Sequence, residues 1–334
     1  MRDDNLRNRD RAERALFAVL PEQAKKRWLD SEGFHLVVGR RPITVEWIGE
    51  GRLGDARRFL SESSRSADLV AAKRLSPGAR AALTENKVSW VDETGAAEID
   101  LESLIISRMG YPTKKRVSRD WTPAVLAVAE SLLCGVDATV AQTVAATELS
   151  AGSCSIALRK LVGLGLLEAD AERGRNSGRR VRNMRTLLDH YAVEAAAHVP
   201  EESLQIGVLW RDPIEGIREA SEHWREFKIE WCATGILASN VMAPMLTHSR
   251  TAEVYIDTKG VSGLYAAANC AHLEPLEGGR LTLRPMPTKG TKKLIQTIDG
   301  LKLAPWPRIY VDLLSAGVRG EEIAEHLLEK LNVT

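Results

Sequence analysis

The first third of the chain alternates short apolar runs with amphipathic stretches. Near the start, Ala15, Leu16, Val19 and Leu20 recur at the spacing of one helical face, which predicts a helix over roughly residues 1–30. The strands predicted after it are 34–38, 43–48, 67–74 and 88–93, and the helices are 53–63 and 76–87, the last with Ser76 as its N-cap and Pro77 in its first turn. Such alternation is typical of an α/β domain.

A different pattern follows residue 121, with three short amphipathic helices and then two strands. The helices are predicted from Thr122, through Pro123, to Gly135, over 139–149, and from Ser153 to about Leu164. The expected apolar faces are Val140, Val144 and Ala145 on the second helix and Cys154, Ala157, Leu158 and Leu161 on the third. Strands over 166–170 and 179–184 flank the turn GRNSG. This succession predicts a winged helix-turn-helix.

The last third again mixes strands and helices. The predicted strands are 204–210, 229–235, 252–257 and 280–286, and the predicted helices are 213–227, 236–242, 307–317 and 319–331. We therefore expect a multidomain α/β protein with a central winged helix, and domains at 1–112, 113–190 and 191–334. The segment 111–121, with one proline and four basic residues, suits the first border.

Composition is that of a soluble globular protein, with 44% hydrophobic and 27% charged residues. The charge is unevenly distributed. The whole chain has 46 basic and 45 acidic residues, but residues 113–190 hold 12 basic and 8 acidic ones. Six arginines lie between Arg173 and Arg185 without an acid among them. Residues 113–190 are therefore basic while the rest of the chain is slightly acidic, which favours nucleic acid as the partner of this region.

In a winged helix, the third helix enters the major groove and the hairpin follows the backbone or the minor groove. The residues expected at double-stranded DNA are Ser153, Ser155, Ile156, Arg159 and Lys160 on the third helix, Arg173, Arg175, Asn176, Ser177, Arg179, Arg180 and Arg182 on the hairpin, and Lys114, Lys115, Arg116 and Arg119 on the preceding arm. The arginines suit phosphates. Docking of an acidic protein on the same surface is the alternative interpretation.

Enzyme chemistry has weaker support in the sequence. The N-terminal domain resembles a degenerate restriction-endonuclease-like fold, in which Lys73 has the position of the lysine but Ala71 stands where the metal-binding acid belongs. A nucleotidyltransferase would need a Gly-Ser pair followed closely by Asp-x-Asp, which is missing. We expect a protein without catalytic activity, metal or cofactor, and keep a DNA-targeted nuclease or nucleotidyltransferase as the alternative.

The cysteines, Cys134, Cys154, Cys232 and Cys270, show no CxxC spacing and lie in apolar runs, which predicts small buried thiols. The first residues are charged rather than typical of a signal peptide, and no apolar run reaches the ~20 residues of a membrane helix. A cytoplasmic, reduced protein without membrane contact is expected.

The C-terminal stretch PRIYVDLLSAGVRGEEIAEHLLEKL resembles the end of AbiEi-family antitoxins of type IV toxin–antitoxin systems. The matching positions are Pro307, Tyr310, Asp312, Leu313, Leu314, Gly317, Arg319, Gly320, Ala324, Glu325 and Leu327. The resemblance covers roughly residues 120–334. It implies a bacterial transcriptional autorepressor that binds operator DNA and opposes a nucleotidyltransferase-like toxin without stable contact. About 110 residues precede the winged helix here, whereas family members normally start with it, so a regulator outside such a system stays open.

Overall fold

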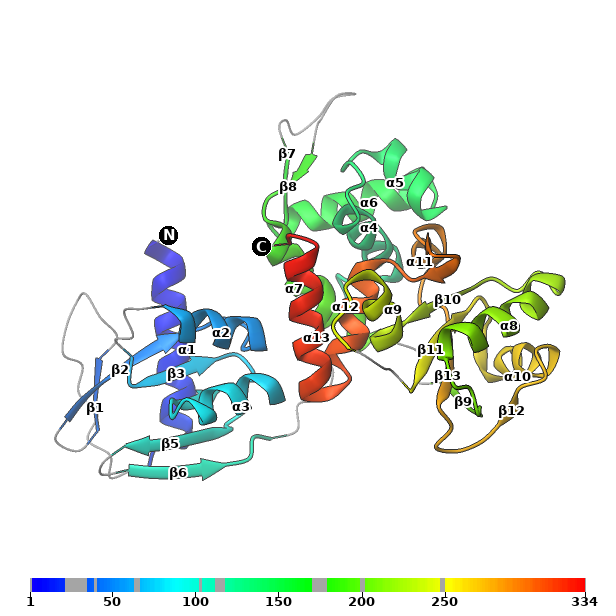
Figure 1. Ribbon diagram of the computed structural model, residues 1–334. Coiled ribbons are helices and arrows are strands. Elements are labelled where there is room, and N and C mark those ends of the chain that lie inside the picture. The colour runs from blue at the N-terminus through cyan, green and yellow to red at the C-terminus, as the bar shows by residue number, and fades with distance from the viewer. Residues whose placement is uncertain are drawn as a thin grey trace. The chain divides into compact units, whose positions relative to one another are not determined.

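The computed structural model describes residues 2–21, 35–38, 41–62, 67–101, 104–111, 118–169, 179–198, 202–246 and 250–333 (Figure 1). Two compact units are present, Met1–Lys115 with Gly317–Glu325, and Arg116–Ala316 with His326–Thr334. Both mix helices with a β-sheet, which confirms the predicted α/β class. The first unit ends within three residues of the predicted border at 112, whereas the border predicted at 190 falls inside a helix of the second unit.

The first unit is built around a six-stranded sheet whose strands follow chain order. Its strands are β1 (His35–Val38), β2 (Arg41–Trp47), β3 (Leu69–Ala72), β4 (Ser89–Asp92), β5 (Ala97–Leu101) and β6 (Leu104–Arg108), and its helices are α1 (Arg2–Val19), α2 (Leu53–Ser61) and α3 (Pro77–Glu85). The central strands β2, β3 and β4 are parallel, and the outer pairs are antiparallel. Strands β5 and β6 are absent from the sequence-based prediction.

Strand β3 supplies both hydrophobic cores of this unit. Leu69 and Ala71 pack in the cluster that contains the α1 residues, and Val70 and Ala72 pack with α2 and α3. Successive side chains of a strand point to opposite faces, so a four-residue apolar strand serves two layers of helices. The N-cap prediction for α3 is confirmed, because the Ser76 hydroxyl accepts the Ala79 amide at 3.2 Å. Helix α1 ends at Val19, and residues 22–34 lie outside the described residues.

The second unit begins with three short helices and a two-stranded antiparallel sheet. These are α4 (Pro123–Leu133), α5 (Val140–Thr147), α6 (Ala151–Gly163), β7 (Leu167–Ala169) and β8 (Arg179–Val181). Each helix has a side-chain N-cap, provided by Thr122, Thr139 and Ser150 respectively. Gly135 follows α4 with a φ of +86°, a left-handed conformation that favours glycine and ends the helix as predicted.

The packed face of α6 is the predicted one, whereas that of α5 is not. Four α6 residues, Cys154, Ala157, Leu158 and Leu161, are buried. On α5 the fully buried residues are Thr143 and Thr147, while Val140 and Val144 are half-buried and Ala145 is exposed. The two threonine hydroxyls donate to the carbonyl oxygens of Thr139 and Thr143, at 2.8 and 2.6 Å. Because these bonds satisfy the hydroxyls inside the helix, threonine can occupy a core face.

A mixed seven-stranded sheet forms the rest of the second unit, in the order β12-β9-β13-β11-β10-β15-β14. Its strands are β9 (Leu204–Gly207), β10 (Trp231–Thr234), β11 (Ala252–Ile256), β12 (Glu274–Pro275), β13 (Leu281–Pro285), β14 (Gln296–Ile298) and β15 (Leu301–Leu303). The pairs β11–β13 and β10–β15 are parallel, and the remaining pairs are antiparallel.

Further helices of the second unit follow the three-helix part (α4–α6) along the chain. They are α7 (Met184–Ala197), α8 (Pro213–Glu226), α9 (Gly235–Met242), α10 (Gly260–Cys270), α11 (Lys289–Lys293) and α12 (Trp306–Leu314), and α13 (Gly317–Lys330) ends the chain. Helix α7 contacts both α4 and α12, and α11 contacts α4 and α5. A Cβ atom on Gly290 would lie 2.9 Å from the Ala127 Cβ, so only glycine permits this approach of α11 to α4.

Two further sequence-based expectations concern cysteines and membranes. Cys154 and Cys232 are buried as predicted, but Cys134 and Cys270 are half-buried. Both of the latter lie at the C-terminal ends of helices, where the turn that follows covers them incompletely. Within the described ranges, no helix combines the length and apolar character needed to cross a bilayer.

Candidate nucleic-acid interface

Helix α6 leaves one face free of packing. Ile156 is 51% exposed, and Arg159 is exposed with no partner among the described residues. Ser153 and Ser155 are half-buried, and the Ser153 hydroxyl lies 2.9 Å from the Ser150 hydroxyl at the N-cap. The accessible chemistry of α6 is therefore a guanidinium beside an apolar side chain, with two hydroxyls near the N-terminus of the helix.

Lys160, also predicted to contact DNA, makes contacts within the protein. Its ammonium group donates to the backbone oxygens of Arg119 and Asp120, at 3.3 and 3.4 Å, and lies 3.6 Å from a carboxylate oxygen of Asp120. These contacts fasten the segment before α4, where Trp121 is 2% exposed, to the end of α6. The side chain of Arg119 remains exposed.

Arginines of the β7–β8 hairpin gather around one acid. Glu168 lies opposite Arg180 in the register and accepts from its guanidinium at 2.9 Å, while Arg182 approaches Glu168 to 3.7 Å. Arg179 has no partner among the described residues. Both paired arginines are more than two-thirds exposed at the side chain, at 73% and 67%. Exposed pairs contribute little, so a phosphate can compete with Glu168 for these groups.

Several residues expected at DNA lie outside the described residues. They are Lys114, Lys115 and Arg116 of the arm and Arg173, Arg175, Asn176 and Ser177 of the hairpin.

Three lysines of α11 lie beside α5 and are missing from the sequence-based prediction. Lys293 binds Glu148 at the end of α5 at 2.8 Å, and Lys292 binds Asp257 at 2.6 Å. The hydrogen bond and charge of Lys293 lower the pKa of Glu148. The charge of Lys289 also lowers the pKa of Glu148, without a hydrogen bond between them. The run TKGTKK could have signalled this basic helix, but its closeness to α5 depends on tertiary packing.

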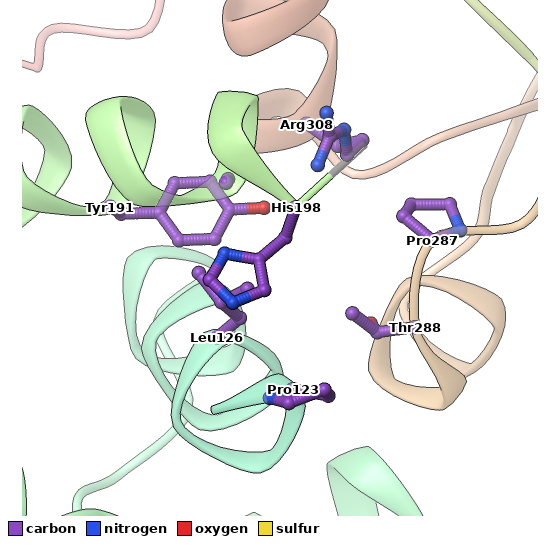
Figure 2. A pocket seen from close by; sticks show the side chains of 8 residues that line it. Pro123, Leu126, Tyr191, His198, Pro287, Thr288 and Arg308 are labelled. Carbon is purple, nitrogen blue, oxygen red and sulfur yellow. The ribbon is translucent and has the colours of Figure 1, made fainter. Parts of the chain in front are cut away.

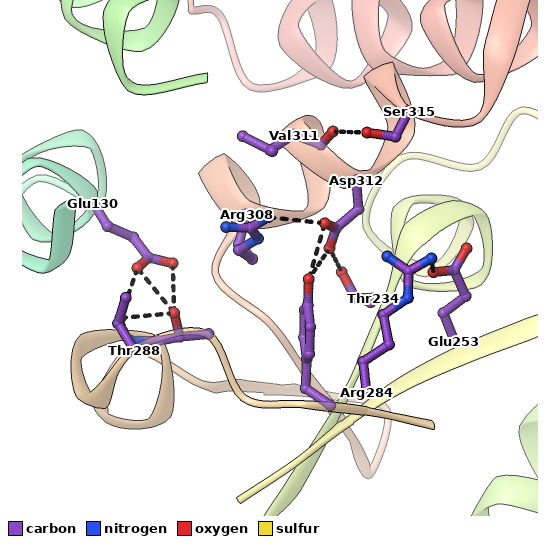
Figure 3. Close-up of polar contacts among 11 residues, drawn as sticks. Glu130, Thr234, Glu253, Arg284, Thr288, Arg308, Val311, Asp312 and Ser315 are labelled. Atoms are coloured by element: carbon purple, nitrogen blue, oxygen red, sulfur yellow. Dashed lines mark hydrogen bonds and ion pairs between the residues drawn. The ribbon is translucent and has the colours of Figure 1, made fainter. Parts of the chain in front are cut away.

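A buried polar network connects α12 to strands β10 and β11 (Figure 3). The Asp312 carboxylate of α12 accepts from the Arg308 guanidinium at 3.1 Å, from the Tyr255 hydroxyl at 2.8 and 2.9 Å and from the Thr234 hydroxyl at 2.5 Å. Arg308 and Asp312 are 2% and 6% exposed. A fully buried ion pair needs such additional hydrogen bonds to offset the loss of hydration. The Asp-Leu-Leu segment of the predicted family motif thus carries a structural carboxylate.

Glu130 of α4 lies fully buried against α11. Its carboxylate accepts from the Thr291 hydroxyl at 3.0 and 3.2 Å and from the Thr288 hydroxyl at 3.4 Å. Burial raises the pKa of Glu130 to about 7, although the charge of Arg308 and the two threonine hydroxyls oppose the shift. This carboxyl group thus titrates near neutral pH at the contact between the three-helix part and the sheet part.

The N-terminal strand β3 carries no carboxylate next to Lys73. Ala71 is fully buried in the sheet, and Lys73 forms an ion pair with Glu50 at 2.8 Å. Asp68 accepts the Thr44 amide at 2.9 Å. Across the residues that the structure describes, no three His, Cys, Asp or Glu side chains are grouped to hold a metal ion.

Comparison of the chain with known proteins finds no relative. No protein-family model, no curated protein and no solved structure matches the chain.

Proposed function

We propose that the protein is a sequence-specific double-stranded DNA-binding transcriptional regulator whose α4–α6 helices and β7–β8 hairpin act as a winged helix. The observation that carries the proposal is the exposed, unpaired guanidinium of Arg159 on the free face of α6, in the same small motif as Arg179, Arg180 and Arg182. In this mode α6 reads base edges in the major groove and the hairpin arginines contact phosphates.

The resemblance to AbiEi-family antitoxins extends the proposal to autorepression. The operator would then lie at the promoter of the protein's own gene, and the opposed toxin would be a nucleotidyltransferase-type protein without stable contact. Selection of bound fragments from random duplex DNA, followed by comparison with that promoter, tests this extension. Enrichment of unrelated sequences would leave a regulator that acts elsewhere.

Binding of the full chain to duplex DNA across a salt series tests the main proposal. For a regulator of this kind, the logarithm of the affinity falls linearly with the logarithm of the salt concentration. The protein should also prefer one DNA sequence over others. Binding that is absent at low salt would redirect the basic surface to an acidic protein. Cleavage of the duplex with magnesium or manganese, abolished by Lys73→Ala, would favour the nuclease interpretation.

Removing hairpin arginines should weaken binding to all sequences alike. For Arg179→Ala with Arg180→Ala, the slope of log affinity against log salt is expected to fall by about one per lost phosphate contact. The reciprocal change Glu168→Gln frees Arg180 and Arg182 from their acidic partner, so it should increase both affinity and slope. Fluorescence anisotropy at several salt concentrations measures both quantities.

Arg225→Ala on α8 is the matched control, since Arg225 is exposed but lies outside the α4–α6 region and the hairpin. Its slope should equal that of the unmodified protein. An unchanged slope in the hairpin variant would remove the hairpin from the interface.

Arg159→Ala should act on specificity rather than on general affinity. If Arg159 binds a guanine edge, the loss on the preferred site is about 1–3 kcal/mol and much smaller on random DNA. Competition binding with selected and scrambled duplexes measures the difference. Equal losses on both duplexes would make Arg159 a phosphate contact and leave base recognition to Ser155 and Ile156.

A further inference from the structure

A small cavity lies within the second unit, where the three-helix part meets the sheet part (Figure 2). It is bordered by Pro123 of α4, by Tyr191 of α7 and His198 at the C-cap of that helix, by Thr288 before α11 and by Arg308 of α12. Its volume is about 50 Å³. A water needs about 10–15 Å³ by this measure, so the cavity holds a few waters or one small polyatomic group.

Arg308 supplies the strongest interaction in this cavity. Its side chain is almost completely buried, and among the described residues only Asp312 accepts a hydrogen bond from it. The Nε atom is buried without a partner in the described residues. A guanidinium has five N–H donors, and leaving them unused away from water is unfavourable. An oxyanion next to Arg308 would accept from donors that Asp312 leaves unused.

Two further polar groups point into the same space. Figure 2 shows the Tyr191 hydroxyl directed toward His198 and Arg308, and this hydroxyl makes no hydrogen bond to a described residue. The His198 Nδ1 atom lies 2.8 Å from the Glu194 backbone oxygen, which assigns a ring proton to Nδ1. The Nε2 atom then accepts from a protonated oxygen of a ligand, or donates to an anionic oxygen when the ring carries a second proton. Two acids act electrostatically on Tyr191 and Arg308. They are Asp312, which already pairs with Arg308, and Glu130, which accepts from Thr288 and Thr291.

A larger groove adjoins the cavity and shares Pro123, Pro287 and Thr288 with it. Its volume is about 610 Å³, within the usual range of pockets for small organic molecules. Three lysines, Lys259, Lys289 and Lys292, line it together with two acids, Glu148 and Asp257, and Lys292 pairs with Asp257. The charged side chains of the lining thus sum to +1, and the groove offers room for an organic body beside Lys259 and Lys289.

We propose that this cavity and groove form a binding site for a small organic anion, whose carboxylate or phosphate group lies against Arg308, Tyr191 and His198. The lining comes from α4 and α7, from the segment between β13 and α11, and from α12. A ligand bound there would therefore hold the three-helix part and the sheet part in one arrangement. Binding itself is independent of DNA. If the protein is a DNA-binding regulator, the bound anion would also change its affinity for the operator, and this consequence alone rests on the proposed function.

Binding of inorganic phosphate and of acetate to the full chain tests the proposal in the absence of DNA. Isothermal titration and thermal unfolding are run against chloride at equal ionic strength, so that general screening is subtracted. We expect saturable binding and a higher melting temperature with at least one anion. Preference for phosphate indicates a phosphorylated ligand, and preference for acetate indicates a carboxylate. No saturable effect of either anion beyond chloride would overturn the proposal.

Variants then locate the binding. Tyr191→Phe and His198→Asn each remove one polar group that faces the cavity and should weaken binding about fivefold, the value of a single hydrogen bond. His190→Asn, an exposed position on the same helix, should bind like the unmodified protein. The melting temperature measured in chloride shows whether each variant folds. If one cavity variant fails to fold, the other still tests the proposal. Equal affinity in both cavity variants and in the control would place the anion elsewhere and overturn the proposal.

Discussion

Asp312→Ala is expected to destabilise the second unit by about 3–5 kcal/mol, the cost of breaking a buried ion pair by removing one partner. The substitution leaves the charge of Arg308 buried without its ion-pair partner. It also deprives the hydroxyls of Tyr255 and Thr234 of their acceptor. Hydrogen exchange of peptides from β10 and β11 measures the loss where it arises, separately from the first unit.

Asp257→Ala is the matched control, because Asp257 pairs with Lys292 at 2.6 Å on the surface. That exposed pair should contribute less than about 1 kcal/mol, although its distance is shorter than the 3.1 Å between Arg308 and Asp312. The double replacement Arg308→Met with Asp312→Leu removes both charges and should regain the part of the loss that comes from the unpaired charge, whereas the hydroxyls of Tyr255 and Thr234 still lack their acceptor. A cost of Asp312→Ala no larger than that of the control would contradict a structural role for the network.

Glu130→Gln is expected to stabilise the protein at pH 8 by about 3 kcal/mol, and the gain should vanish near pH 4. Burial raises the pKa of Glu130 from 4.5 to about 7, and each pKa unit corresponds to about 1.4 kcal/mol. The folded state therefore holds a proton that the unfolded state has lost between these two pH values. Its stability falls as pH rises through this window and stays level above it.

Glutamine has nearly the same shape, keeps an oxygen that can accept from Thr291 and does not titrate. The difference in unfolding free energy between variant and unmodified protein, measured at several pH values, isolates this one group from other carboxylates. Glu222→Gln, an exposed position on α8, should leave the pH profile unchanged. Parallel profiles for Glu130→Gln and the unmodified protein would show that folding leaves the pKa of Glu130 unchanged.

Where the sequence-based prediction failed, a local rule was overridden by packing. On α5, the apolar residues were expected inside, but Thr143 and Thr147 occupy the core because their hydroxyls bond to carbonyls of their own helix. The spacing of Lys160 puts it on the face of α6 that points away from the core, but its ammonium group donates to the backbone oxygens of Arg119 and Asp120, some 40 residues earlier. Counting apolar positions cannot detect either contact, because neither depends on hydrophobicity.

Local chemistry was sufficient for the elements themselves. The sequence determined the caps at Ser76 and Thr122, the buried face of α6 and the alternation of strands and helices, since these depend on neighbours a few residues apart. Only the tertiary structure brought Glu130 to Thr291, 161 residues away, and Tyr255 to Asp312, 57 residues away. Such groups meet because burial of the apolar faces brings distant segments together, and their altered chemistry arises from the exclusion of water there.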